Sequence, residues 1–190
     1  KYNADELGNI TSMSIIDDGE GIDRETLHET FGCYQDSIKK RSFQWSSQVK
    51  GNQGRGRYAF NCFADKAEWE TVFNKNENLL RYKLFIYKGD NHHFDDGDES
   101  DLKVEHNRHT GTVVSFSNVN IPVEALEKED FTEYLCKEYA VFLELNKAFG
   151  KQLLINGQKL DYAHVIAESE QKVFTVENEG EIQTFEATFI

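Results

Sequence analysis

The sequence predicts a two-layer α/β sandwich, with helices on one face of a mixed sheet. Three observations favour this fold class. Several segments rich in β-branched and aromatic residues are bounded by turn residues, which indicates strands. One long stretch in the second half repeats its apolar residues at helical spacing. The chain has 190 residues, 38% of them hydrophobic and 13% aromatic, which is enough to bury one principal core.

The first complete strand is predicted at Ile10 to Ile16, which is rich in β-branched and apolar residues. Lys1-Tyr2 is interpreted as the end of a preceding strand, so that the polar segment Asn3 to Asn9 becomes a hairpin loop. Three further strands of the same character are expected at Trp69 to Phe73, Leu79 to Tyr87 and Thr112 to Phe116.

Two short helices are predicted before the second half of the chain. Asp23 can cap the first, which runs to Phe31. The second, Gly54 to Lys66, has a glycine-rich start and an apolar inner face. The residues expected on that face are Tyr58, Ala59, Cys62 and Phe63.

The longest helix is predicted after Pro122 and ends at Gly150, a residue typical of helix stops. Beyond it, Asn156-Gly157 indicates a tight hairpin turn. Two more strands are expected at Val173 to Val176 and Thr184 to Ile190. We therefore expect one domain over residues 1–150, with residues 151–190 as the first strands of a second domain.

A D-x-G-x-G pattern follows the first strand and comprises Asp17, Gly19 and Gly21. A carboxylate at this point can accept a hydrogen bond from an exocyclic amine, while the glycines let the backbone turn and approach a flat ring. A tight turn without any ligand explains the same pattern. The motif alone leaves both interpretations open.

A G-x-x-G-x-G pattern, Gly51, Gly54 and Gly56, opens the second short helix. Free backbone N–H groups at a helix amino end form an anion site. A long polar loop, Gly32 to Gln53, leads into it instead of a strand, which argues against a dinucleotide fingerprint. No Gly-Lys-Ser/Thr follows, which argues against a P-loop.

A third motif, Thr110-Gly111-Thr112, leads into a strand. The three motifs in this order resemble the Bergerat-fold (GHKL) ATPase superfamily of gyrase, heat-shock chaperones, histidine kinases and MutL. The resemblance covers about Tyr2 to Phe149. It implies a Bergerat-type ATP-binding fold, followed over residues 151–190 by the start of a transducer-like domain.

The resemblance also implies a role for each motif residue. Asp17 would bind the adenine amine, with Thr112 helping through an ordered water. Gly32 to Gln53 would be the lid. The residues expected around the base are Gly19, Gly21 and Ile22, and those expected around the phosphates are Gly51, Gly54, Arg55 and Gly56.

Two departures from the superfamily limit the assignment. The helix that carries the magnesium-binding Asn and the water-activating Glu should precede the first strand, and it is not in this sequence. Asn3-Ala4-Asp5 echoes it but is interpreted as hairpin loop. The phosphate-sensing cation commonly lies in the transducer domain and cannot be assigned. The catalytic base and the magnesium ligand therefore stay unknown.

Within the superfamily, three features look most like bacterial MutL- and MORC-like proteins: the run Gly54 to Phe60, the strand from Trp69, and Phe142 to Tyr162. The implied function is binding of ATP with Mg²⁺, with slow hydrolysis in the intact protein driving lid closure and association. The partner would be a second copy or another protein. Alternatives are a non-hydrolysing nucleotide sensor and a histidine-kinase catalytic domain.

The composition narrows the partners and the compartment. The net charge of −13 disfavours nucleic-acid binding by this portion alone. No apolar run approaches the ~20 residues that cross a bilayer, so a cytoplasmic protein without membrane contact is expected. The three scattered cysteines, Cys33, Cys62 and Cys136, favour reduced, mostly packed thiols.

Two charged groups have weaker interpretations. Basic residues gather around the proposed phosphate site, where they suit a triphosphate or are simply solvated: Lys39, Lys40, Arg41, Lys50, Arg55 and Arg57. A second group could bind a hard cation, but its spacing matches no calcium loop and favours an exposed hairpin tip: His92, His93, Asp95, Asp96, Asp98 and Asp101.

Overall fold

The computed structural model describes residues 1–27, 56–90, 94–97, 100–101, 109–178 and 181–190. These residues fall into two compact units, and the boundary lies between Ala125 and Leu126. The expected functional domains, 1–150 and 151–190, stay a prediction. No helix in the described ranges is long and apolar enough to cross a membrane.

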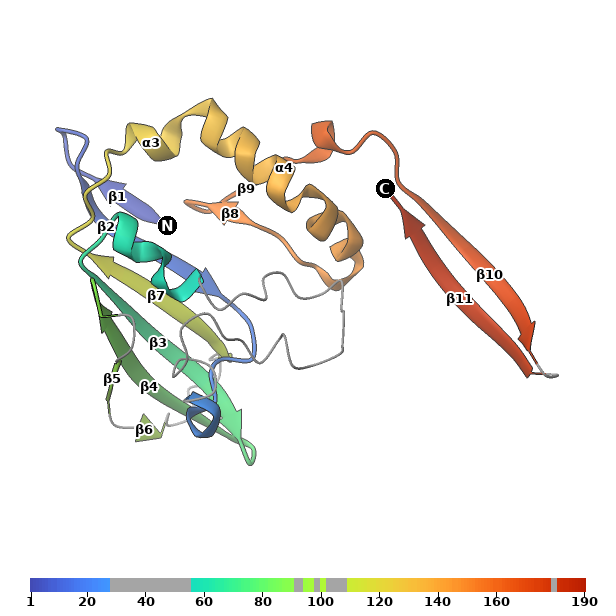
Figure 1. The fold of residues 1–190 in the computed structure, drawn as a ribbon, viewed down its shortest axis with the longest axis horizontal. Coiled ribbons are helices and arrows are strands. Elements are labelled where there is room, and N and C mark those ends of the chain that lie inside the picture. Colours follow the sequence, from blue (N-terminus) through green and yellow to red (C-terminus); the bar gives the residue numbers. More distant parts are fainter. Residues whose placement is uncertain (28–55, 91–93, 98–99, 102–108, 179–180) are drawn as a thin grey trace. The chain divides into compact units, whose positions relative to one another are not determined.

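The first unit is built on one sheet. Its strands in spatial order are β1 (Tyr2–Ala4), β2 (Ile10–Asp17), β7 (Gly111–Ser117), β3 (Lys66–Lys75), β4 (Asn78–Tyr87) and β5 (Asp95–Asp96), and β6 (Ser100–Asp101) also pairs with β4 (Figure 1). Every pairing among these described strands is antiparallel, so the expected mixed sheet is wrong. The reason is that β7 lies between β2 and β3, which run in the same direction but are not neighbours.

One face of this sheet carries the core. Side chains alternate along a strand, so Trp69 and Phe73 on β3 and Leu84 on β4 point to one face and are buried. The helical segments η1 (Arg24–Thr26) and η2 (Gly56–Cys62) adjoin this core, which includes Leu27, Tyr58 and Phe60. This arrangement confirms the predicted fold class, with helical segments packed on an antiparallel sheet.

The opposite face of β3 and β4 is charged. Lys83 lies 2.8 Å from Glu68 and 3.2 Å from Glu70, and Arg81 lies 3.3 Å from Glu70. The hydrogen bond from Lys83 holds the pKa of Glu68 below its ordinary value, and the bonds to Glu68 and Glu70 raise the pKa of Lys83. Such cross-strand pairs reinforce the register that the apolar face sets.

The predicted helix over 54–66 is wrong in type and length. The described part, η2, is a 3₁₀ helix that ends at Cys62, and β3 begins at Lys66. In a 3₁₀ helix residues i and i+3 align, so Ala59 and Cys62, both expected on the inner face, share a side, and that side is exposed. Phe60 is buried instead, at 2% exposure.

The ends of other predicted elements also shift. Asn3 and Ala4, interpreted as hairpin loop, belong to β1, which pairs with β2 as expected. Asp23 caps η1 by accepting a hydrogen bond from the Glu25 N–H (2.9 Å). The acidic segment after β4 contains the short edge strands β5 and β6, which the sequence pattern did not reveal.

A long helix dominates the second unit. Its elements are α4 (Glu129–Leu145), η3 (Lys147–Phe149), β8 (Leu154–Ile155), β9 (Gln158–Lys159), η4 (Ala163–Val165), β10 (Glu170–Asn178) and β11 (Glu181–Phe189), and the short α3 (Glu124–Glu127) precedes them. Cys136, Leu143 and Leu160 form its buried core. The single helix expected from Pro122 to Gly150 is divided: the long helix α4 ends at Leu145, and Gly150, at φ +71°, caps the short 3₁₀ helix η3 that follows it.

The hairpin predicted at Asn156-Gly157 is confirmed, and the two further predicted strands correspond to β10 and β11, which are longer than expected. Asn156 (φ 48°) and Gly157 (φ 85°) form the turn between β8 and β9, as an Asn-Gly pair should. β10 and β11 pair over their full lengths. Among the side chains that the structure describes on these strands, Val173 is 65% exposed and Ile182 is 72% exposed.

Candidate nucleotide-binding site

Asp17 and Thr112 meet at the ends of neighbouring strands. Asp17 is the last residue of β2 and is the register partner of Thr112 on β7, which in turn is the partner of Thr71 on β3. Directly opposed residues project to the same face of a sheet. The three side chains therefore form a row on the core face. Asp17 is exposed, whereas Thr112 and Thr71 are 5% and 0% exposed.

The hydroxyl of Thr71 connects this row to the chain that follows Asp17. It accepts a hydrogen bond from the Ile22 N–H at 2.9 Å and lies 3.2 Å from the Thr112 hydroxyl. It also lies within donor distance of the Gly111 carbonyl, at 3.4 Å. A hydroxyl has one proton and two lone pairs. If the Thr112 hydroxyl donates, the Thr71 oxygen accepts from Thr112 and from the Ile22 N–H, and the Thr71 proton is donated to the Gly111 carbonyl.

Thr71 was missed by the sequence analysis. Its signal is a polar residue at an inward position between Trp69 and Phe73, on a strand that otherwise buries apolar side chains there. A buried hydroxyl has to be hydrogen-bonded, so such a position indicates a polar partner from another segment. Which segment supplies it depends on the strand order.

The D-x-G-x-G turn lies directly against β3 and β7. Gly21 has φ +78°, and a Cβ there would come within 2.1 Å of the Val72 carbonyl oxygen. Gly111 has φ +148°, and its Cβ would lie 2.4 Å from the Asp17 carbonyl oxygen. Only glycine fits such approaches. Gly21 thus allows a close contact with the sheet, in addition to any role beside a base.

The carboxylate of Asp17 is oriented by its own turn. Its Oδ1 accepts the Gly19 N–H at 2.9 Å, the arrangement of an Asx turn. In the described part of the chain, the other oxygen, Oδ2, has no hydrogen-bond donor assigned to it. Because Asp17 is exposed at the strand end, Oδ2 can meet the amine of a ligand.

The phosphate half of the expected site is only partly described. Gly51, Gly54 and Arg55 lie outside the described residues, as does the lid Gly32 to Gln53. Gly56 opens η2 and is exposed, and a Cβ there would meet no atom of the described residues within 4 Å. The structure therefore brings together Asp17, Gly19, Gly21, Ile22 and Thr112.

Most of the charged candidates also fall outside the described part. Of the basic group only Arg57 is described, with its guanidinium carbon 5.0 Å from the centre of the Tyr58 ring. Of the acidic group, His92, His93 and Asp98 lie outside it, and Asp95, Asp96 and Asp101 are placed by their backbone alone.

The comparisons with known proteins define the class. A sequence model of the family described as histidine kinase-, DNA gyrase B- and HSP90-like ATPase matches residues 2–112, more than half of the chain. The chain belongs to this family. It is thus an ATP-binding domain of the GHKL ATPase type, which confirms the predicted superfamily. The closer resemblance to MutL- and MORC-like proteins stays a prediction.

Solved structures with a similar trace are ATPase regions of topoisomerase II. One from Saccharomyces cerevisiae, bound to ICRF-187 (dexrazoxane), shares 17% identity with a TM-score of 0.37 over 60% of this chain. A second from the same organism shares 13% identity with a TM-score of 0.42 over 87%. The ATPase and transducer domains from Balamuthia mandrillaris share 18% identity with a TM-score of 0.46 over 93%. The chain spans 29%, 49% and 50% of these structures. No curated protein sequence matches it.

Proposed function

We propose that the intact protein binds ATP with Mg²⁺ at this site, hydrolyses it slowly, and uses the nucleotide as a conformational switch. In the ATP-bound state the lid closes and a second copy or another protein associates. The observation that carries the proposal is the placement of Asp17, at the end of β2 and in register with Thr112.

The carboxylate of Asp17 is the group that recognises adenine. Its Oδ1 is held by the Gly19 N–H, so Oδ2 has a defined direction and accepts the exocyclic amine of the base. Thr112 supports this contact through a water, and Gly19, Gly21 and Ile22 border the base. Ile22 is fixed by its hydrogen bond to Thr71, which supports this role.

The phosphates are assigned to the glycine-rich segment. Gly51, Gly54, Arg55 and Gly56 approach them with backbone N–H groups and one guanidinium, because glycine has no side chain to hold an anion away. That no atom of the described part of the chain would contact a Cβ at Gly56 supports its part in this assignment. Residues 32–53 close over the γ-phosphate as the lid.

Mg²⁺ is proposed to accompany the nucleotide and to offset the negative charge of its phosphates. We assign no residue of this chain to the metal, and none as the catalytic base. Hydrolysis and switching are therefore proposed for the intact protein. Residues 151–190 are proposed to contribute to a transducer-like domain, which is supported by the exposed apolar side chains of the β10–β11 hairpin.

The test compares Asp17→Asn with Asp18→Asn in the full-length protein, by calorimetric titration with ATP. An amide at residue 17 turns a donor toward the adenine amine and loses a charge-assisted bond of about 1.5–3 kcal/mol. The affinity should fall roughly 10- to 100-fold. Asp18 is also exposed and serves as the matched control, with affinity unchanged.

Two results would contradict the proposal. If only Asp18→Asn loses ATP, the register of the motif is wrong. If both variants bind ATP like the wild type, adenine recognition by Asp17 is wrong. Phosphate release by the wild type then tests the enzymatic part, because a sensor binds ATP without turning it over.

A further inference from the structure

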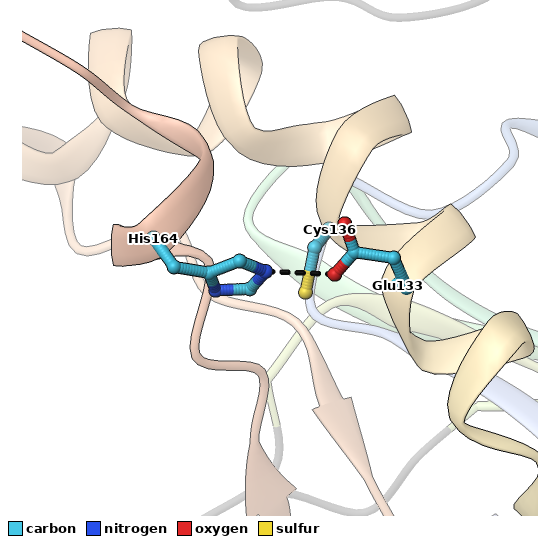
Figure 2. A group of neighbouring side chains, drawn as sticks. All are labelled: Glu133, Cys136 and His164. Atoms are coloured by element: carbon cyan, nitrogen blue, oxygen red, sulfur yellow. Dashed lines mark hydrogen bonds and ion pairs between the residues drawn. The ribbon is translucent and has the colours of Figure 1, made fainter.

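A carboxylate, a thiol and an imidazole, three side chains that can bind metal ions, meet in the second unit, and none of them is among the residues proposed to bind ATP. Glu133 and Cys136 come from α4, and His164 comes from η4. Their ligand atoms all lie within 4.8 Å of one another. His164 Nε2 is 2.7 Å from Glu133 Oε2, and the Cys136 sulfur lies beside this contact (Figure 2).

The local structure accounts for this meeting. Residues 133 and 136 are three apart on a helix and therefore share a face. Leu160 and Tyr162 belong to the cluster that packs with α4, which brings the following turn close to the helix. The Asp161 carboxylate accepts the Ala163 N–H at 3.1 Å and so shapes the turn that carries His164.

We propose that Glu133, Cys136 and His164 bind a divalent transition-metal ion of the zinc class. Zinc takes sulfur, nitrogen and carboxylate oxygen ligands in tetrahedral geometry, and three protein ligands leave one position for water. A thiolate and an imidazole favour zinc over Mg²⁺ or Ca²⁺, which prefer oxygen alone. The side chains of His164 and Glu133 are 54% and 37% exposed, so an ion can reach them from solvent.

The charges around the thiol suit a cation. The Cys136 side chain is buried, and burial together with the nearby carboxylates of Glu133 and Asp161 raises the pKa of its thiol. The same negative charges favour a divalent ion at the sulfur. On binding, the Sγ–H bond breaks, the proton leaves to solvent, and the Sγ–metal bond forms. Binding therefore strengthens as pH rises.

Only small movements are needed. With metal–nitrogen and metal–sulfur bonds of about 2.0–2.3 Å, ligand atoms around a tetrahedral ion lie roughly 3.3–3.8 Å apart. His164 Nε2 and Glu133 Oε2, now 2.7 Å apart, must separate slightly, and the thiol already lies within 4.8 Å of both. The thiol now donates to the Asp161 carbonyl at 3.3 Å, a bond that deprotonation releases. His164 lies on a three-residue turn, so its ring can adjust.

The bound ion would join η4 to the first half of α4. Without a metal, the same contact is an exposed ion pair when His164 is protonated, and such pairs contribute little to stability. A metal would couple the two elements in a way that a chelator reverses.

The test titrates Zn²⁺ and Co²⁺ into the full-length protein after treatment with a chelator. We expect one ion per chain, and with Co²⁺ a thiolate charge-transfer band and the intense visible bands of tetrahedral cobalt. Glu133→Gln and His164→Asn change exposed side chains and should keep the helical circular dichroism. Each should weaken binding at least about 10- to 100-fold, the range seen even for outer-shell partners.

Matched controls are Cys62→Ser and His109→Asn, which change an exposed thiol and an exposed histidine outside the group. Both should bind the ion like the wild type. Cys136→Ser should abolish the thiolate band. The proposal is overturned if the cobalt complex lacks that band, if His164→Asn binds as tightly as the wild type, or if excess Mg²⁺ displaces the ion. If Glu133 and His164 form only an ion pair and the group binds no metal, the band is absent and His164→Asn does not differ from the wild type.

Discussion

Thr71→Val tests whether the buried hydroxyl network holds the nucleotide-binding turn in place. Valine keeps the shape of threonine and removes the hydroxyl that accepts the Ile22 N–H at 2.9 Å and contacts Thr112 at 3.2 Å. Thr71 is fully buried, so water cannot replace the lost partner. A buried polar group left without a partner costs about 1–3 kcal/mol.

For a chain of this size, a loss of about 2 kcal/mol lowers Tm by roughly 4–8 °C. Affinity for ATP should also fall several-fold, because Ile22 and the turn from Asp17 are less firmly held. Urea unfolding and calorimetric titration with ATP measure the two effects. Thr71→Ser is the control: it loses a methyl group, worth about 1 kcal/mol, but keeps the hydroxyl and should keep ATP affinity. An unchanged unfolding midpoint in Thr71→Val, or equal loss of affinity in both variants, would refute this reasoning.

Three further predictions follow from single contacts. Gly111→Ala should destabilise the fold by several kcal/mol and weaken ATP binding, because its Cβ would lie 2.4 Å from the Asp17 carbonyl oxygen. Gly89→Ala is the control: Gly89 has φ +84°, and its Cβ would meet no described atom within 4 Å, so the change should cost only about 1 kcal/mol in urea unfolding and leave binding unchanged. Gly56→Ala should leave Tm within about 2 °C yet lower ATP affinity; unchanged affinity would remove Gly56 from the phosphate site. The hydrogen bond from Lys83 lowers the pKa of Glu68 from 4.5, so the stabilisation by this pair is present above about pH 4.5 and is lost as the pH falls further. In Glu68→Gln, the urea concentration at the unfolding midpoint should therefore depend less on pH in this acidic range.

The base half of the site could be predicted because its signals are local. The β-branched run from Ile10 predicts β2, and the strand end then places Asp17 at the edge of the sheet. The turn at Asn156-Gly157 follows equally from residue type, since both residues need positive φ. In these cases neighbouring residues alone decide the backbone.

Other features depended on partners distant in sequence. η2 has 3₁₀ geometry where an α-helix was predicted, and apolar spacing over so few residues does not separate the two. The edge strands β5 and β6 consist of acidic and polar residues, which have low intrinsic strand propensity and pair because β4 offers a free edge.

The sequence by itself determined the order of the three motifs, and with it the ATPase class and the position of Asp17. Tertiary structure alone decided that β7 enters between β2 and β3, which places Thr112 beside both Asp17 and Thr71. It also decided that Gly21 has to be glycine, because the Val72 backbone lies against it. The group of Glu133, Cys136 and His164 also depends on tertiary structure, because His164 on η4 comes 31 residues after Glu133 on α4. The physical reason is that local propensity selects strands and turns, whereas contacts between distant segments depend on which strand edges pair and which faces are buried together.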